Sequence, residues 1–509
     1  MTADPLDPAP ARHDLRLVPA VLVSWAVVLS GLYLGSLAAA VLGAAGLVVA
    51  AAAALSSRSA AVLAVGAVAA AVALVVGTQT WQVEHHPLRS AAQRGSAATV
   101  VVHLRDDPRA VAFPGYGGRQ PQVQQVVIHA ELEAAVVAGQ QWRTGGRVIL
   151  LAPAHGWVGL LPGQRVQTTG LLGAPNRSDL TVAVLRVRGE PDVLSAPSAV
   201  QRVAERLRSG LRLAVRVLDP EPGGLLPALV VGDTSAMVPT VEAEFRAAGL
   251  THLIAVSGTN VAIVCGVVLG LARLAGLGPR IAVMLAALTL IGFVVLCRPS
   301  PSVLRAAVMG GVMLLALVLG RHRSAVPALC GAVLVLLLVD PSLGNDPGFA
   351  LSVLATGALV LLAPGWSAAL RRHGVPAGIA EALAVPAAAH VITAPVVAGL
   401  SGQVSLVAVL TNLMATPAVA PATVLGVLAA VVAALHPGAA VVVVHLAGPA
   451  VSWLVEVGHQ GSAVPDGVLG WPDGVFGALL LALIVAVVLL AMRAHRLRVL
   501  AAAGLVGAL

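Results

Sequence analysis

Long apolar runs constrain this chain more than any other feature of its sequence. A helix needs about 20 apolar residues to cross roughly 30 Å of hydrocarbon. Three such runs lie at about 19–36, 38–55 and 60–77, and after a long polar gap further runs begin near 250, 281, 302, 325, 349, 378, 404, 439 and 475. Only 11% of the residues are charged, against about 25% in an average soluble domain. We therefore predict a polytopic α-helical membrane protein of about twelve spans.

Arginine in the short connections predicts the orientation, because cytoplasmic loops carry the excess of basic residues. With the N-terminus in the cytoplasm, the arginines that fall on that side are Arg12, Arg16, Arg58, Arg273, Arg280, Arg321, Arg323, Arg371, Arg372, Arg493, Arg496 and Arg498. Only Arg298 lies clearly on the opposite side. We expect both termini to be cytoplasmic and the large polar insert to be extracytoplasmic.

The polar insert changes the pattern from apolar runs to short alternating segments. Five of these, "ATVVVHLR", "QQVVIHAELEA", "GGRVILLAP", "QRVQTTGLL" and "LTVAVLRVR", are separated by turns rich in Gly and Pro. Alternation bounded by such turns predicts strands. Five strands favour an OB-like β-barrel, although the pattern also fits another small β domain.

The expected organisation has five parts. They are an N-terminal membrane segment of about three helices at 1–84, the OB-like domain at 85–195, a basic amphipathic helix and re-entry linker at 196–245, a transmembrane domain of about nine helices at 246–498, and a short tail at 499–509. The amphipathic helix, within 198–219, alternates apolar residues with arginines. We expect it to lie in the headgroup region; presenting arginine to a polyanion is the alternative.

Three polar residues, His252, Ser257 and Asn260, stand in the apolar stretch "GLTHLIAVSGTN". Polar side chains inside a span usually face the bundle interior or a water-filled path. A helix break at the Ser257-Gly258 step would direct all three into a protected cavity. The alternative is that they form helix–helix hydrogen bonds in a packed core.

The segment "RPSPSVLR" contributes Arg298 and Arg305 beside a helix start set by Pro299 and Pro301. Helix N-termini favour phosphate, and the two arginines add positive charge there. The alternative for Arg305 is that it snorkels to the interface or pairs with Asp340 or Asp346.

His390 and Asn412 repeat this pattern of a polar residue near prolines. We place both as further candidates for the path. The acidic residues in "DPS" and "NDPG" fit ordinary turn chemistry better than cation handling.

Six segments of the sequence form a colinear set of motifs. They are "LPGQRVQTTG" in the insert, then "ALVVGDTSAM", "FRAAGLTHLIAVSGTNVAIV", "RPSPSVLRAAVM", "DPGFALSVLATGALVL" and "HVITAPVVAGLSGQVSLVAVLTNLMATPAVAP". In composition and order they resemble the ComEC family of competence proteins. The resemblance implies a channel in the bacterial cytoplasmic membrane that conducts single-stranded DNA. It also implies a DNA receptor outside and a DNA-translocating ATPase inside. The sequence has no GxxxxGK[ST] loop of its own for nucleotide.

Many members of this family continue into a metallo-β-lactamase-like nuclease domain, and the present sequence ends at Leu509 without its HxHxDH-like cluster. The histidines are scattered, none at the spacing of two ligands of one metal. We therefore expect no catalytic residues, no metal and no cofactor, and a separate nuclease as a further partner.

Contacts between single-stranded DNA and the β domain require arginine for the backbone and aromatic rings for the bases. The candidates are Arg143, Arg147, Arg165, Trp142 and Trp157. Because nine arginines face seven acidic residues in this domain, the charge supports weak guiding contact only.

Two other functions stay open. A secondary transporter of a small solute or lipid precursor would also use helix breaks beside polar residues, but the large insert and the lack of a clear repeat disfavour it. An intramembrane hydrolase built on Ser257 and His252 is disfavoured because "AVSGT" is not GxSxG.

Overall fold

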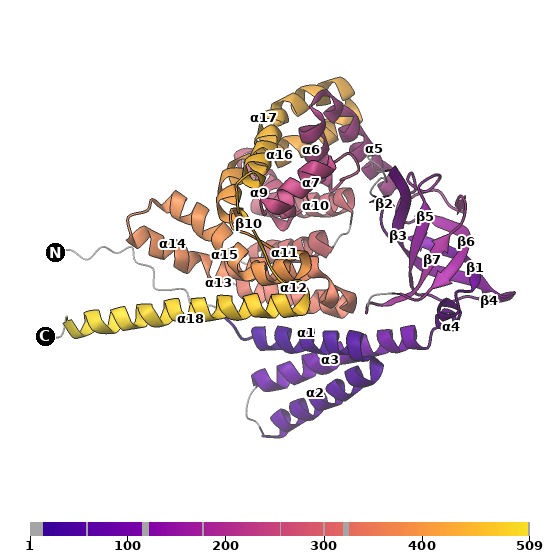
Figure 1. Cartoon of the computed structure of the whole chain (residues 1–509), viewed down its shortest axis with the longest axis horizontal. Coiled ribbons are helices and arrows are strands. Elements are labelled where there is room, and N and C mark those ends of the chain that lie inside the picture. The colour runs from indigo at the N-terminus through magenta and orange to yellow at the C-terminus, as the bar shows by residue number, and fades with distance from the viewer. Residues whose placement is uncertain are drawn as a thin grey trace.

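The computed structural model describes residues 14–56, 60–113, 122–175, 178–254, 256–298, 301–318 and 325–506. Figure 1 shows a β domain at one end of a larger helical part, with the N-terminal helices along one side of it. The N-terminal helices are α1 (Val18–Leu34), α2 (Ser36–Ser56), α3 (Ala60–Glu84) and the short α4 (Pro87–Gln93). The chain therefore enters the β domain from α4.

The second helical group follows the β domain. Its helices are α5 (Ala199–Ala214), α6 (Pro220–Val231), α7 (Pro239–Ala247), α8 (Thr251–Ile254), α9 (Gly258–Leu274), α10 (Pro279–Cys297), α11 (Pro301–Val318), α12 (Ala325–Val339), α13 (Pro347–Leu361), α14 (Ala363–Arg372), α15 (Ala377–Ser401), α16 (Ala408–Leu435), α17 (Pro437–Ser462) and α18 (Gly474–Val506). Two 3₁₀ turns, η2 (Val215–Val217) and η3 (Pro341–Asn345), and a small antiparallel pair, β9 (Gln403–Ser405) with β10 (Val468–Gly470), complete it.

Seven helices in the described residues are long and apolar enough to cross a membrane, or eight if the bent pair α13 and α14 is one span. Four more apolar segments are shorter, in α1, α9, α11 and α12. The prediction of a multi-span helical protein is confirmed in this form. The larger number of about twelve spans would need the shorter helices to cross as well, and it stays a prediction.

The β domain contains β1 (Ala97–Leu104), β2 (Arg109–Phe113), β3 (Gln122–Val137), β4 (Gln140–Trp142), β5 (Arg147–Pro153), β6 (Arg165–Gly173), β7 (Thr181–Val187) and β8 (Asp192–Val193). The strand order is β1-β3-β5-β7-β6-β8, and β1 also pairs with β6. Five strands therefore form a closed circuit of pairings. The β5–β7 pair is parallel, whereas the others in the circuit are antiparallel.

The alternating sequence pattern explains this sheet. In β1, β5 and β6 every second residue is buried, because successive side chains in a strand point to opposite faces. The buried face includes Val102, Ile128, Leu150 and Leu185, which form one hydrophobic core. The five predicted strand segments correspond to the five strands of the circuit.

One face of α5, in the linker at 196–245, packs against other helices, whereas Val203 and Leu213 on its other face are exposed. In α5, Arg208 and Leu211 are buried, and Gly210 lies so close to α16 that a Cβ there would be 2.9 Å from the Cβ of Ala433. Every residue of α6 from 222 to 231 is buried. Helix α5 is thus anchored on one side and open on the other, and its position in the headgroup region stays a prediction.

Candidate functional site

Helix α6 ends inside the protein, where its last carbonyls need hydrogen-bond donors. The final four carbonyls of any helix lack partners within that helix. Asn260 of α9 donates to the carbonyl of Leu229 at 2.8 Å, and Cys297 of α10 donates from its thiol to Val230 at 3.4 Å. Arg208 of α5 donates to the carbonyl of Val231 at 2.6 Å. Side chains from three helices thus satisfy three successive carbonyls.

The end of α7 has the same arrangement. Ser405 and Thr411 each donate from the hydroxyl at 2.7 Å to the carbonyls of residues 247 and 248, and Asn412 donates to that of Gly249 at 3.3 Å. Gly249 has φ +73°, and a Cβ there would overlap the Cβ of Ala408. Only glycine fits this turn, because it needs both a left-handed backbone and close contact with α16.

The predicted helix break at Ser257-Gly258 is present. Helix α8 ends at Ile254 and α9 begins at Gly258, with Ser257 as its N-cap accepting a hydrogen bond from the backbone N–H of Asn260 at 3.4 Å. Asn260 is only 1% exposed, whereas His252 is exposed. The three residues therefore do not share one surface. For Asn260 the structure favours the helix–helix hydrogen bond over a position in a path wall.

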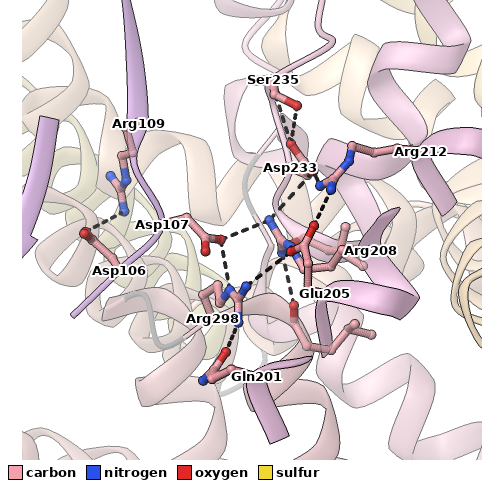
Figure 2. Close-up of polar contacts among 12 residues, drawn as sticks. Asp106, Asp107, Arg109, Gln201, Glu205, Arg208, Arg212, Asp233, Ser235 and Arg298 are labelled. Carbon is pink, nitrogen blue, oxygen red and sulfur yellow. Dashed lines mark hydrogen bonds and ion pairs between the residues drawn. The ribbon is translucent and has the colours of Figure 1, made fainter. Parts of the chain in front are cut away.

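A charge network joins the β domain to the helical part (Figure 2). It contains three arginines and three carboxylates, namely Arg208, Arg212, Arg298, Asp107, Glu205 and Asp233. They come from α5, the residues that follow α6 and α10, and the loop between β1 and β2. Because the formal charges cancel, the network as a whole presents no surplus for a polyanion.

Asp107 is the contribution of the β domain to this network. Its carboxylate lies 2.9 Å from Nε of Arg298 and 3.3 Å from Nη2 of Arg208. Arg298 also contacts Gln201, and it lies 3.5 Å from Glu205. Buried charges of opposite sign at such distances hold one another in place, since either one alone would be costly to bury.

Asp233 and Arg212 form the other half of the network, 2.6 Å apart. Burial alone raises the pKa of the Asp233 carboxyl, but hydrogen bonds from Ser235 and the charge of Arg208 outweigh it, so the pKa is lowered. Burial lowers the pKa of Arg212, and hydrogen bonds to Asp233 and Glu205 more than offset that effect, so this pKa is raised. Both groups are therefore charged at neutral pH.

The prediction that Arg298 and Arg305 would offer charge to phosphate at a helix start is not supported. Arg298 is buried in the network just described. Arg305 is 2% exposed, donates to the carbonyl of Phe349 at 3.4 Å and lies 5.7 Å from the centre of that ring. Neither guanidinium reaches the surface, so snorkelling of Arg305 is also wrong. The partners described above for Arg298, and Phe349 for Arg305, are far away in the sequence.

A second junction links the β domain to η3. Arg147 lies 2.9 Å from Asp340 and donates to the hydroxyl of Ser342 at 2.6 Å. Burial raises the pKa of Asp340, but the hydrogen bond and charge of Arg147 prevail and the pKa is lowered. Asn345 adds a hydrogen bond to the carbonyl of Ser178 at 3.1 Å. Arg147 is therefore an anchor between domains, which the prediction of a DNA contact missed.

The remaining β-domain candidates differ in exposure. Trp157 is 0% exposed and donates to the carbonyl of Gly189, so its ring is not available to a base. Arg165 donates to both oxygens of Glu133 at 2.8 and 2.6 Å. Trp142 is 38% exposed and Arg143 next to it is exposed. Among these candidates, Trp142 and Arg143 are the pair best placed to meet a ligand.

His390 and Asn412, the further path candidates, are half-buried on α15 and α16. Asn412 holds the end of α7, as described above. Over the described ranges, no group of three or more His, Cys, Asp or Glu side chains could hold a metal ion. Polar residues of the helical part such as Asn260, Asn412 and Arg208 thus act as donors to helix ends or as members of ion pairs.

The apolar helices and the appended sheet define a multi-pass membrane protein with a separate β domain. Comparison with protein families matches a Competence protein model to residues 229–496, slightly more than half of the chain. The chain belongs to this family, the ComEC family of competence proteins. The family resemblance in the sequence motifs is confirmed.

ComE operon protein 3 of Bacillus subtilis strain 168 is 37% identical over 146 residues. The matched part is 28% of the present chain and 19% of that protein, so the match spans about a fifth of the relative's length. No solved structure matches the chain.

Proposed function

We propose that this protein takes up DNA during natural transformation, by conducting one strand across the bacterial cytoplasmic membrane. Its membership of the competence family, with the match extending over most of the second helical group, is the observation that carries the proposal. The protein would act as a conduit rather than an enzyme.

We further propose that the β domain is an OB-like barrel on the extracytoplasmic side. The closed circuit of five strands, with one parallel pair, supports the barrel. The excess of arginine in the short connections on the other side of the membrane supports the extracytoplasmic position of the β domain. It would also put both termini in the cytoplasm. Trp142 and Arg143 are then the residues through which a single strand would make weak contact with this domain.

The proposal requires partners, because the sequence contains no nucleotide-binding loop that could drive transport. A DNA receptor would deliver the strand outside, and a DNA-translocating ATPase would draw it inside. A nuclease would degrade the complementary strand. These three partners rest on the family resemblance, and co-purification from competent cells would identify them.

Deletion of the gene in its own host tests the function. We expect the number of transformants with marked chromosomal DNA to fall to the background, and a plasmid copy of the gene to restore it. Unchanged transformation would refute the proposal. Unchanged DNA uptake together with loss of accumulation of a small solute or lipid precursor would instead establish the secondary transporter.

A further inference from the structure

A polar cavity of about 440 Å³ lies where the N-terminal helices meet the β domain. Its walls come from the ends of α1 and α3, from α4, and from residues 174–175 and 178–181 beside β6 and β7. Among the described residues, the charged side chains that line it are Glu84, Arg89 and Asp179. Glu84 is exposed and the other two are half-buried, so a ligand can reach them from the surface.

The two carboxylates are held in place but keep acceptor capacity. Glu84 accepts from the backbone N–H of Ser36 at 3.0 Å and from its hydroxyl at 2.5 Å. Asp179 accepts at one oxygen from the backbone N–H of Thr181 at 2.9 Å. An ionised carboxylate has about four acceptor positions. Both can therefore take further hydrogen bonds from a cation.

Arg89 supplies the opposite charge. Its one hydrogen bond to protein among the described residues is a long contact of 3.5 Å to the carbonyl of Val83. A guanidinium has five N–H donors in a planar fork that matches the oxygens of a phosphate. The cavity thus combines a phosphate-binding group with two carboxylates.

Aromatic residues beside the cavity are of the kind found at the level of lipid headgroups. Tyr33, in the last turn of α1, and Trp81, near the end of α3, are exposed, and Trp81 stacks on His85 with ring centres 4.6 Å apart. Tyr and Trp concentrate at the membrane–water boundary. The exposed Leu34 and Leu37 beside the cavity provide apolar surface for acyl chains.

We propose that this cavity binds the headgroup of an amine-bearing phospholipid. The phosphate contacts Arg89, and the ammonium donates to Glu84 and Asp179. A lipid with a phosphate and no amine is disfavoured, because it has no donor for the free acceptor positions of Glu84 and Asp179. The bound lipid would fix the membrane surface against the junction of α3, α4 and the β domain. This inference does not depend on the proposed transport of DNA.

The test is native mass spectrometry of the full chain, purified in detergent and incubated with equal amounts of phosphatidylethanolamine and phosphatidylglycerol. We expect one phosphatidylethanolamine to be retained with a preference of about tenfold or more, which is what one charge-assisted contact supplies. Equal retention of the two lipids would overturn the proposal.

Variants locate the site. Arg89→Gln removes the phosphate contact, and Asp179→Asn removes one charge while keeping an acceptor for the Thr181 N–H; both should abolish the preference. Arg94→Gln is the matched control, since Arg94 is exposed at the end of α4 and does not line the cavity. Retention of the preference in both cavity variants would refute the assignment. Displacement by an equal concentration of soluble glycerophosphoethanolamine would assign the cavity to a soluble amine phosphate instead of a lipid.

Discussion

Replacing Arg208 with methionine tests whether the charge network holds the β domain to the helices. Methionine keeps the length of the side chain and its apolar contacts but removes the charge and all donors. The guanidinium now donates to the carbonyls of Val231 at 2.6 Å and Leu296 at 3.1 Å. It also lies 3.3 Å from Asp107. It is also within 4.0 Å of Glu205 and Asp233. The change therefore leaves two helix-end carbonyls and three carboxylates with fewer partners.

The expected cost follows from these losses. Removing one partner of a buried ion pair costs about 3–5 kcal/mol, because the other charge stays buried without compensation. The cost of a buried carbonyl that loses its donor, about 1–3 kcal/mol, is part of this penalty and is not added to it. We expect Arg208→Met to lower the free energy of unfolding by about 3–5 kcal/mol, measured by titration with SDS in mixed micelles.

Two comparisons separate the network from a general effect. Arg206→Met is the control, because Arg206 is exposed on the same helix, and it should change stability by less than about 0.5 kcal/mol. The double variant Arg208→Met with Asp107→Asn restores the balance of charge. It should lose less than the sum of the single variants by about 1–3 kcal/mol. Equal effects of Arg208→Met and Arg206→Met, or additive single effects, would refute the reasoning.

Three further predictions concern other parts of the molecule. Gly249→Ala should lower the melting temperature more than Gly276→Ala, because both glycines have positive φ but nothing lies within 4 Å of the Cβ position at Gly276; equal effects would exclude the clash. Trp157→Ala should cost about 3–5 kcal/mol of stability. Trp142→Ala should leave stability nearly unchanged and weaken binding of a fluorescent oligonucleotide by about tenfold; unchanged binding would remove Trp142 as a contact. Asp340 has a lowered pKa in the folded protein. Its contribution to stability is therefore complete above the unfolded pKa near 3.9 and is lost as the pH falls through the folded pKa. Between about pH 5 and about pH 3 the wild type should lose more thermal stability than Asp340→Asn.

The predictable parts of this structure depend on local sequence patterns. The strands of the circuit follow from alternation between Gly and Pro turns, and the start of α9 follows from Ser257 before Gly258. In these cases the residues that decide the structure are neighbours in the chain. The prediction of Trp157 as a DNA contact is wrong because this residue lies in a turn, and turns give no periodic signal of burial.

The charge network could not be predicted from the sequence for a different reason. Arg298 and Asp107 are 191 residues apart, and each alone fits a surface position. An arginine near a helix start predicts phosphate binding when it has no carboxylate partner. The sequence does not show that Asp107 is the partner of Arg298. The family motifs likewise identify the protein's relatives but not the anchoring role of Arg147, whose carboxylate partner lies beyond α12.

The ends of α6 and α7 explain why polar residues occur in apolar segments of this chain. A helix that stops inside the protein exposes carbonyls where water cannot reach them, and each unsatisfied group costs several kcal/mol in an apolar medium. Asn260 and Asn412 each satisfy one of these carbonyls, so the fold by itself accounts for their chemistry. His252 has an exposed side chain in the same motif. His252 is therefore the better position at which to test the proposed passage of a DNA strand along these helices. A substitution there should lower transformation without the loss of stability expected at Asn260, and unchanged transformation would remove His252 as a contact of the strand.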